Sequence, residues 1–371
     1  MYEMTYEYRL HAIADSLQKY GHNITVLSAK NSQVLEKRNY NIKQIKIVLR
    51  KKQKYSIAKM IRIFEYYVKF FIHGLRIKSD IIIASDVMML PIGYMIKKIN
   101  GAKLVYDMRE LWPWTKNSGL RIWKIIDRTL INKADEWIVV NDLRKNFIEK
   151  EYNTLKEGKI LHPYPYLLKN ISQGRLRKFL TEKGSTSNFT VLYKGGILPG
   201  NNLEILIDAA ELFDESISLI ILGFNDSKIY LNSLIERANK SKKKNVFFHP
   251  PVISTEIMSY VAEASVGIVS YSANCINSDL CEPCKLYDFM MQGVPTIVSS
   301  VKGTEAIINK YKTGILISFN YQEIGSQINN LKKNPTLYNE LKNNSILYSS
   351  KLNWENEQEK LFDIINNLSE E

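Results

Sequence analysis

The chain has 371 residues and a formal charge of +13, with 45% hydrophobic and 24% charged residues. These values predict a soluble globular protein with two domains, each with its own core. They exclude a membrane-spanning protein, because no uncharged apolar run approaches the roughly 18 residues of a spanning helix. The N-terminus has no signal-peptide series and the three cysteines suggest no disulfide framework, so we expect a cytoplasmic protein.

The first part of the chain alternates helices and strands as a doubly wound α/β unit does. Its strand segments are continuous apolar runs, which is typical of parallel strands buried on both faces. We expect a helix over 7–19, a tight turn and then a strand within 21–28, strands at 80–86, 103–110 and 137–141, and a helix that ends near 96.

A basic window lies between the first two of these strands. From Lys43 to Lys78 the chain has eleven Lys or Arg residues and one acid, Glu65. The window also contains six aromatic residues, Tyr55, Phe64, Tyr66, Tyr67, Phe70 and Phe71. Cations and aromatics interleaved on a helix predict a surface that lies on an anionic membrane leaflet. Alternatively, the aromatics are core and the lysines are only solvated. Nucleic acid is not expected, because no nucleic-acid-binding motif accompanies the charge.

The later part of the chain repeats the alternation after a polar, basic segment at 169–188 that predicts a linker. We expect a strand opening at Phe189, a helix over 202–213, strands at 217–223, 246–248, 266–271, 296–299 and 314–317, and a final helix to Leu368. Between the first strand and helix lies the turn 194–200, where Gly195 and Gly196 let the backbone approach a ligand closely.

The segment 282–300 contains the strongest chemical signal in the sequence. Pro283 suits the first position of a helix, and the free amides after it, with the Lys285 ammonium, favour an anion such as a diphosphate. Asp288 lies three residues later on the same face, where a carboxylate can accept hydrogen bonds from a ribose diol. Gly293 ends the helix. A solvated Lys285–Asp288 pair without a ligand is the alternative interpretation.

This segment resembles the donor-binding signature of family 4 glycosyltransferases of the GT-B fold (glycosyl transferases group 1), in the form that starts Pro-x-Lys-Leu-Tyr-Glu/Asp and ends Gly-x-Pro. The resemblance aligns Asp288 with the second acid of the family pattern. The first acid falls on Leu280, with Asp279 and Glu282 as neighbouring substitutes. The family's phosphate-neutralising cation falls on Asn201, so Lys194, Lys285 or the helix amides would replace it. The implied donor-binding residues are Gly195, Gly196, Asn201, Glu282, Pro283, Cys284, Lys285, Leu286 and Asp288.

The segment 106–113 resembles the acceptor-side motif of the same family. The resemblance implies that Asp107, Arg109 and Glu110 project into the cleft between two domains and act in catalysis together with Lys285. A strand-end ion pair between Arg109 and a neighbouring acid is the alternative.

The resemblance also implies the domain organisation of a GT-B protein: two Rossmann-like, doubly wound domains that face a central cleft, with the C-terminal helix crossing back to the N-terminal domain. We expect an acceptor-side domain at 1–168, without the family's first strand and completed by 352–371. The linker at 169–188 and a nucleotide-sugar donor domain at 189–351 follow.

The implied reaction is transfer of a sugar from a nucleoside diphosphate sugar to a sugar or lipid-linked hydroxyl acceptor, with retained configuration and no metal or cofactor. The setting is bacterial surface polysaccharide or glycolipid assembly at the inner face of the plasma membrane. Two alternatives stay open: a non-catalytic GT-B subunit that supports a partner glycosyltransferase, and a nucleotide-sugar epimerase. Zinc at Cys281 and Cys284 is not expected, because the sequence offers no further ligands nearby.

Overall fold

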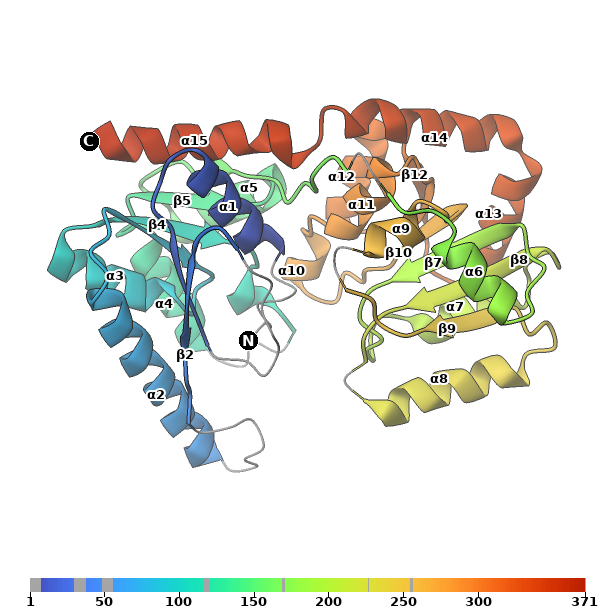
Figure 1. Ribbon diagram of the computed structural model, residues 1–371, viewed down its shortest axis with the longest axis horizontal. Coiled ribbons are helices and arrows are strands. Elements are labelled where there is room, and N and C mark those ends of the chain that lie inside the picture. The colour runs from blue at the N-terminus through green and yellow to red at the C-terminus, as the bar shows by residue number, and fades with distance from the viewer. Residues whose placement is uncertain are drawn as a thin grey trace. The chain divides into compact units, whose positions relative to one another are not determined.

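The computed structural model describes residues 8–29, 38–48, 56–116, 121–168, 171–225, 227–253 and 256–370, with only the backbone of 56–60. The chain divides into two compact units (Figure 1). Unit 1 comprises Met1–Pro163 and Glu357–Glu371, and unit 2 comprises Tyr164–Asn356. Of the predicted segments, residue 7 of the first helix, 49–55 of the basic window and 169–170 of the linker lie outside the described residues.

The described part of unit 1 contains two parallel sheets. Its strands are β1 (Thr25–Ala29), β2 (Asn41–Ile45), β3 (Ile81–Ser85), β4 (Lys103–Met108), β5 (Glu136–Val139) and β6 (Lys159–Ile160). Strands β1 and β2 pair with each other, and the other four form a sheet in the order β3-β4-β5-β6. Its helices are α1 (Tyr8–Lys19), α2 (Ser56–Leu75), α3 (Leu90–Asn100), α4 (Arg121–Ile131) and α5 (Asp142–Tyr152), and η2 (Trp112–Trp114) is a short 3-10 helix. Strands β2 and β6 were not among the predicted elements.

Strand β4 is the centre of the unit 1 core. Leu104, Val105, Tyr106 and Met108 are all completely buried, as the continuous apolar run predicts for a parallel strand covered on both faces. The C-terminal helix closes this unit, because the Phe362 ring stacks on Tyr20 with centroids 4.1 Å apart. Glu357 also accepts a hydrogen bond from the His162 amide at 2.7 Å.

Unit 2 has one six-stranded sheet with the order β12-β11-β10-β7-β8-β9, and all its pairings are parallel. The strands are β7 (Phe189–Lys194), β8 (Ile217–Leu222), β9 (Val246–His249), β10 (Val266–Val269), β11 (Thr296–Ser299) and β12 (Gly314–Ile317). The helices are α6 (Arg175–Glu182), α7 (Leu203–Ala210), α8 (Lys228–Lys240), α9 (Ile257–Val261), α10 (Ile276–Asp279), α11 (Cys284–Met291), α12 (Lys302–Tyr311), α13 (Tyr321–Lys333) and α14 (Pro335–Ser349). The last helix, α15 (Trp354–Glu370), belongs to unit 1 from Glu357 onward. The strand order reverses between β7 and β10, and such a switch point is where open α/β sheets bind ligands.

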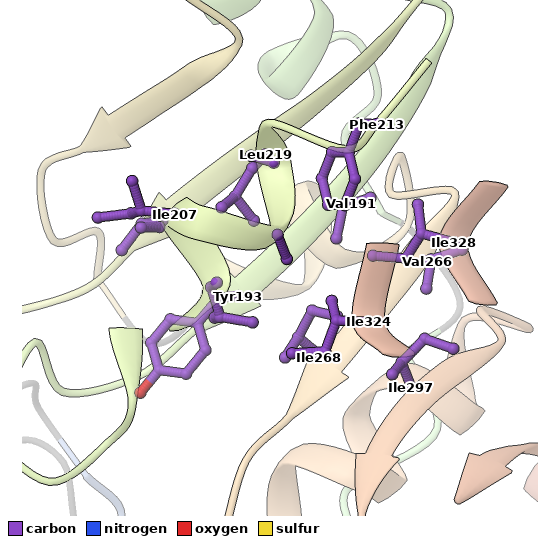
Figure 2. Packing of buried hydrophobic residues seen from close by; sticks show 14 of the residues in the cluster. Val191, Tyr193, Ile207, Phe213, Leu219, Val266, Ile268, Ile297, Ile324 and Ile328 are labelled. Carbon is purple, nitrogen blue, oxygen red and sulfur yellow. The ribbon is translucent and has the colours of Figure 1, made fainter. Parts of the chain in front are cut away.

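The unit 2 core has two layers, one on each face of the sheet. Val191 and Tyr193 of β7 belong to one layer, which Figure 2 shows with Ile207 of α7 and Ile324 of α13 packed over the strands. Leu192, between them in sequence, belongs to the opposite layer, which also holds residues of α6, the helix within the predicted linker. Alternate residues of one strand therefore anchor both helical layers.

Candidate functional site

A glycine turn follows β7 at the switch point of unit 2. Gly195 has φ +140°, and a Cβ at Gly223, just after the neighbouring strand β8, would lie 1.6 Å from the Gly195 carbonyl oxygen. The Gly195 amide donates to the Leu222 carbonyl at 3.0 Å. A side chain at Gly223 would meet the Gly195 backbone, and Gly195 has a positive φ that side chains rarely adopt, so both positions require glycine.

Lys285 of α11 lies directly against this turn. A Cβ at Gly195 would be 2.5 Å from Lys285 Nζ, and Nζ lies 5.1 Å from the centre of the Tyr193 ring. Within the described residues, neither Nζ nor the Lys285 amide has a hydrogen-bond acceptor or ion-pair partner. Burial lowers the pKa of Lys285 to about 8, and the nearby Lys194 charge acts in the same direction. A partly buried cation without an acceptor beside a glycine turn suits an anionic ligand.

Lys194 and Asp288 form an ion pair next to Lys285. Lys194, the last residue of β7, is 5% exposed and its Nζ donates to Asp288 Oδ2. The other carboxylate oxygen, Oδ1, has no donor among the residues that the structure describes. The sequence places Asp288 and Lys285 on the same helical face. Lys194, one of the candidates for the missing phosphate-neutralising cation, lies 94 residues from Asp288 and is paired with it. The cluster therefore holds two cations and one carboxylate, with hydrogen-bonding capacity left on both Lys285 and Asp288.

Asn201 braces the glycine turn from within. Its Nδ2 donates to the Gly196 carbonyl at 2.8 Å and to the Tyr193 hydroxyl oxygen at 3.2 Å. The Tyr193 hydroxyl itself donates to the Gly196 carbonyl at 3.0 Å. The Asn201 side-chain amide, which was predicted to lie at the phosphates, thus stabilises the conformation of the turn.

The start of α11 corrects one predicted detail. Pro283 is the N-cap residue, with φ −77° and an extended ψ of 106°, and the helix begins at Cys284. The missing N–H of proline costs nothing at a cap either, so both positions suit it. Cys284 is exposed, whereas Leu286 is 1% exposed and anchors the helix in the core. After the helix, Gly293 has φ +63°. Its amide donates to the Met290 carbonyl, and the Val294 amide donates to the Phe289 carbonyl. The helix therefore ends at this glycine, as predicted.

The two candidate substitutes for the family's first acid have other partners. Glu282 accepts a hydrogen bond from the Tyr287 hydroxyl. Asp279 pairs with Lys302 Nζ at 3.1 Å and also accepts from the Lys302 backbone amide at 3.2 Å. Leu280, at the position of the acid itself, is 8% exposed. This side of the α11 start therefore holds structural contacts in place of a second carboxylate facing a ligand.

In unit 1, Asp107 is buried, which corrects the expectation that it projects toward a ligand. It is 1% exposed and pairs with Arg9 at 2.8 Å, and Arg9 also donates to the Leu161 carbonyl at 2.7 Å. A charged carboxylate at the end of a central strand needs such a partner, because burial without one is costly. Arg9 was missed in sequence reasoning, since it lies 98 residues from Asp107.

The neighbouring charges at the ends of β3 and β4 are also paired. Arg109 Nη2 lies 2.7 Å from Asp86 Oδ2. Arg109 thus forms a strand-end ion pair with a neighbouring acid, which was the alternative to a catalytic role. Burial raises the pKa of Asp86 to about 6, against the opposing effect of Arg109. Glu110 is more exposed, at 38%, and lies 3.3 Å from Arg144 Nη2. Asp86 directly follows β3, and Asp107 is the last residue but one of β4. Two acids at the ends of neighbouring strands were the signal that could have identified Asp86.

In the part of the chain that the structure describes, no group of three or more His, Cys, Asp or Glu side chains is arranged to hold a metal ion. Cys275 is partly buried, Cys281 is buried and Cys284 is exposed, and no disulfide links these three cysteines.

One family model matches most of unit 2. Residues 178–348 match the family model of the glycosyl transferases group 1. No curated protein matches the chain.

Solved structures match nearly the whole chain. They include Alr3699/HepE of Anabaena in complex with UDP and glucose, with 15% identity over 97% of this chain and 95% of that one and a TM-score of 0.74. Sucrose-phosphate synthase of Thermosynechococcus elongatus has 15% identity over 97% and 92%, with a TM-score of 0.75. WaaG, a glycosyltransferase involved in lipopolysaccharide biosynthesis, has 16% identity over 98% and 96%, with a TM-score of 0.70. The chain has the two-domain, Rossmann-like GT-B fold, and its second unit carries the match to the glycosyl transferases group 1.

Proposed function

We propose that this protein is a glycosyltransferase that moves a sugar from a nucleoside diphosphate sugar to a hydroxyl acceptor. The observation that carries the proposal is the Lys285 ammonium, which lies against the Gly195 turn without an acceptor among the described residues. The family match over unit 2 supports it, and so do the UDP complexes named among the similar structures.

In this proposal the diphosphate lies at the start of α11. Lys285 Nζ and the Lys285 amide both approach it, and the amide belongs to the positive end of the helix dipole. Asp288 Oδ1 accepts a ribose hydroxyl, while its other oxygen stays with Lys194. As the glycosyl bond breaks, negative charge grows on the departing diphosphate, and fixed donors stabilise that charge more than they stabilise the ground state.

The acceptor step is proposed to proceed with retention and without a metal or cofactor. An oxygen of the departing phosphate takes the proton of the acceptor hydroxyl, so no protein base is required. Of the three acceptor-side candidates, Asp107 is buried in its pair with Arg9 and Glu110 is the most exposed. Glu110 and Arg109 are therefore proposed to position the acceptor. We propose a sugar or lipid-linked acceptor of surface polysaccharide or glycolipid assembly, reached from the cytoplasmic side of the membrane.

The proposal is tested by ligand binding and turnover. Thermal unfolding in the presence of UDP, GDP, ADP and their sugars should show a higher melting temperature with one nucleotide, because a ligand that binds only the folded state stabilises it. With that donor, the purified chain should release nucleoside diphosphate. If no nucleotide stabilises the protein, the proposal is wrong.

A second candidate is a non-catalytic subunit that supports a partner glycosyltransferase. The apolar Leu280 at the position of the first family acid favours it, as does the burial of Asp107. Such a subunit would bind a nucleotide or none, and would release no diphosphate by itself. Release that depends on a second purified glycosyltransferase would support this candidate over the first.

A further inference from the structure

Helix α2 presents an apolar stripe to solvent. Ile61, Phe64, Val68 and Ile72 are 52%, 70%, 37% and 40% exposed, and no polar residue between 61 and 75 is as exposed as these four. Their spacing of three and four residues places them on one face of the helix. The opposite face, with Phe70 only 3% exposed, packs on α3 in the unit 1 core. The helix therefore has a second apolar face that the described core does not cover.

Positive charge borders this stripe. The only acid of the window, Glu65, pairs with Lys69 at 2.5 Å and accepts from the Val48 amide at 2.7 Å, which brings the 65% exposed Val48 beside the helix. Among the described residues, Arg62, Arg76 and Lys78 have no ion-pair partner. The chain between Val48 and Ile61 adds five Lys or Arg residues and no acid. Among the residues that the structure describes, three cations on or just after the helix thus have no paired acid.

We propose that this surface docks on an anionic lipid bilayer. The surface consists of Val48, Ile61, Phe64, Val68 and Ile72, and we call it the α2 surface. The apolar side chains enter the boundary between headgroups and acyl chains, while Arg62, Arg76 and Lys78 lie at the level of the anionic headgroups. The helix lies in the plane of the membrane, and no helix in the described ranges combines the length and apolar character for crossing one.

The charge of the α2 surface favours lipid over the other occupants. In a symmetric dimer the same patch faces itself, so the cations of both copies would meet and repel. A nucleic acid would pair with the cations but would leave the apolar stripe in water. An anionic bilayer satisfies both the apolar and the cationic part of the surface. This inference does not rest on the proposed sugar transfer, because docking requires neither donor nor acceptor.

The test is sedimentation of the full chain with vesicles of phosphatidylcholine alone or with phosphatidylglycerol, without nucleotide. The wild type should pellet with the anionic vesicles only. Phe64→Ser/Val68→Ser should lower the partition coefficient at least about tenfold, and Arg76→Glu/Lys78→Glu should lower it most at low salt. The matched control is Leu155→Ser/Ile229→Ser, which removes two apolar side chains that are 81% and 85% exposed elsewhere. This control should pellet like the wild type, and circular dichroism should show that all variants fold.

Each of four results would overturn the proposal. The first is equal pelleting, or none, with both kinds of vesicle. The second is a Phe64→Ser/Val68→Ser variant that pellets like the wild type or loses no more than the control. The third is a concentration-dependent dimer, seen by analytical ultracentrifugation, that the same variant disperses while vesicles bind neither protein. Binding of single-stranded RNA that this variant retains and the charge variant loses, with no vesicle binding, would also contradict it.

Discussion

The strand ends of the two units differ in how their charges are compensated. In unit 1, the three charged side chains that the sequence singled out, Asp107, Arg109 and Glu110, have partners in Arg9, Asp86 and Arg144. In unit 2, Lys194 and Asp288 pair, while the Lys285 ammonium has no acceptor among the described residues. Paired charges contribute to the structure, whereas a cation kept partly buried without an acceptor is ready for an anion. The difference locates the candidate chemistry of the diphosphate in unit 2.

The largest effect should come from breaking the buried pair of unit 1. Arg9→Met leaves the Asp107 carboxylate, which is 1% exposed, without its cation. We expect a loss of about 3 to 5 kcal/mol in the free energy of unfolding. Urea unfolding measures it, with Arg38→Met as the control because Arg38 and its partner Asp15 are more exposed, at 28% and 23%. A loss below about 1 kcal/mol, as for surface pairs, would show that the Arg9–Asp107 pair is not structural.

Removal of the unit 2 cation should affect turnover more than folding. Lys285→Met should lower kcat by roughly 100- to 1000-fold, as loss of one preorganised donor to a developing charge does, and leave binding of the bare nucleoside unchanged. Steady-state kinetics and calorimetry with nucleoside and nucleoside diphosphate separate the two effects. Lys228→Met, a change in an exposed lysine of α8, is the control. Equal losses for nucleoside and diphosphate would remove Lys285 from the phosphate site.

Asp288 should contribute a smaller amount, through the ribose. Asp288→Asn keeps an oxygen for Lys194 but loses the charge that strengthens hydrogen bonds from a diol. We expect about tenfold weaker nucleotide binding, or about 1.4 kcal/mol. The matched ligand is the 2′,3′-dideoxy nucleotide, whose affinity should not change in this variant. The assignment fails if the ribonucleotide keeps its full affinity.

The smallest effect is a pH dependence at the same cluster. The pKa of Lys285 is lowered to about 8, so the ammonium that binds phosphate is present below that pH and is lost as pH rises through it. Going from pH 7 to 8, kcat/KM should fall about twofold, and by about tenfold at pH 9. Lys285→Arg should retain its charge and abolish the decline. A decline that persists in this variant would belong to another group.

The sequence was sufficient for the fold and for the members of the unit 2 cluster that lie close together in the chain. Apolar runs predict the buried parallel strands, and Lys285 and Asp288 share a helical face at three-residue spacing. β2 was missed because its sequence, Asn-Ile-Lys-Gln-Ile, is polar and has no apolar run. In the described residues this strand pairs with β1 in a two-stranded sheet. Periodicity also cannot show which residues of a strand and a distant helix meet, as Lys194 of β7 and Asp288 of α11 do over 94 positions.

The position of the diphosphate tests the central claim most directly. We expect a crystal structure of the protein with a nucleoside diphosphate to place a phosphate oxygen about 2.7 to 3.2 Å from Lys285 Nζ, above the Gly195 turn. A diphosphate bound elsewhere, or an α11 start occupied by protein side chains in the complex, would contradict the account.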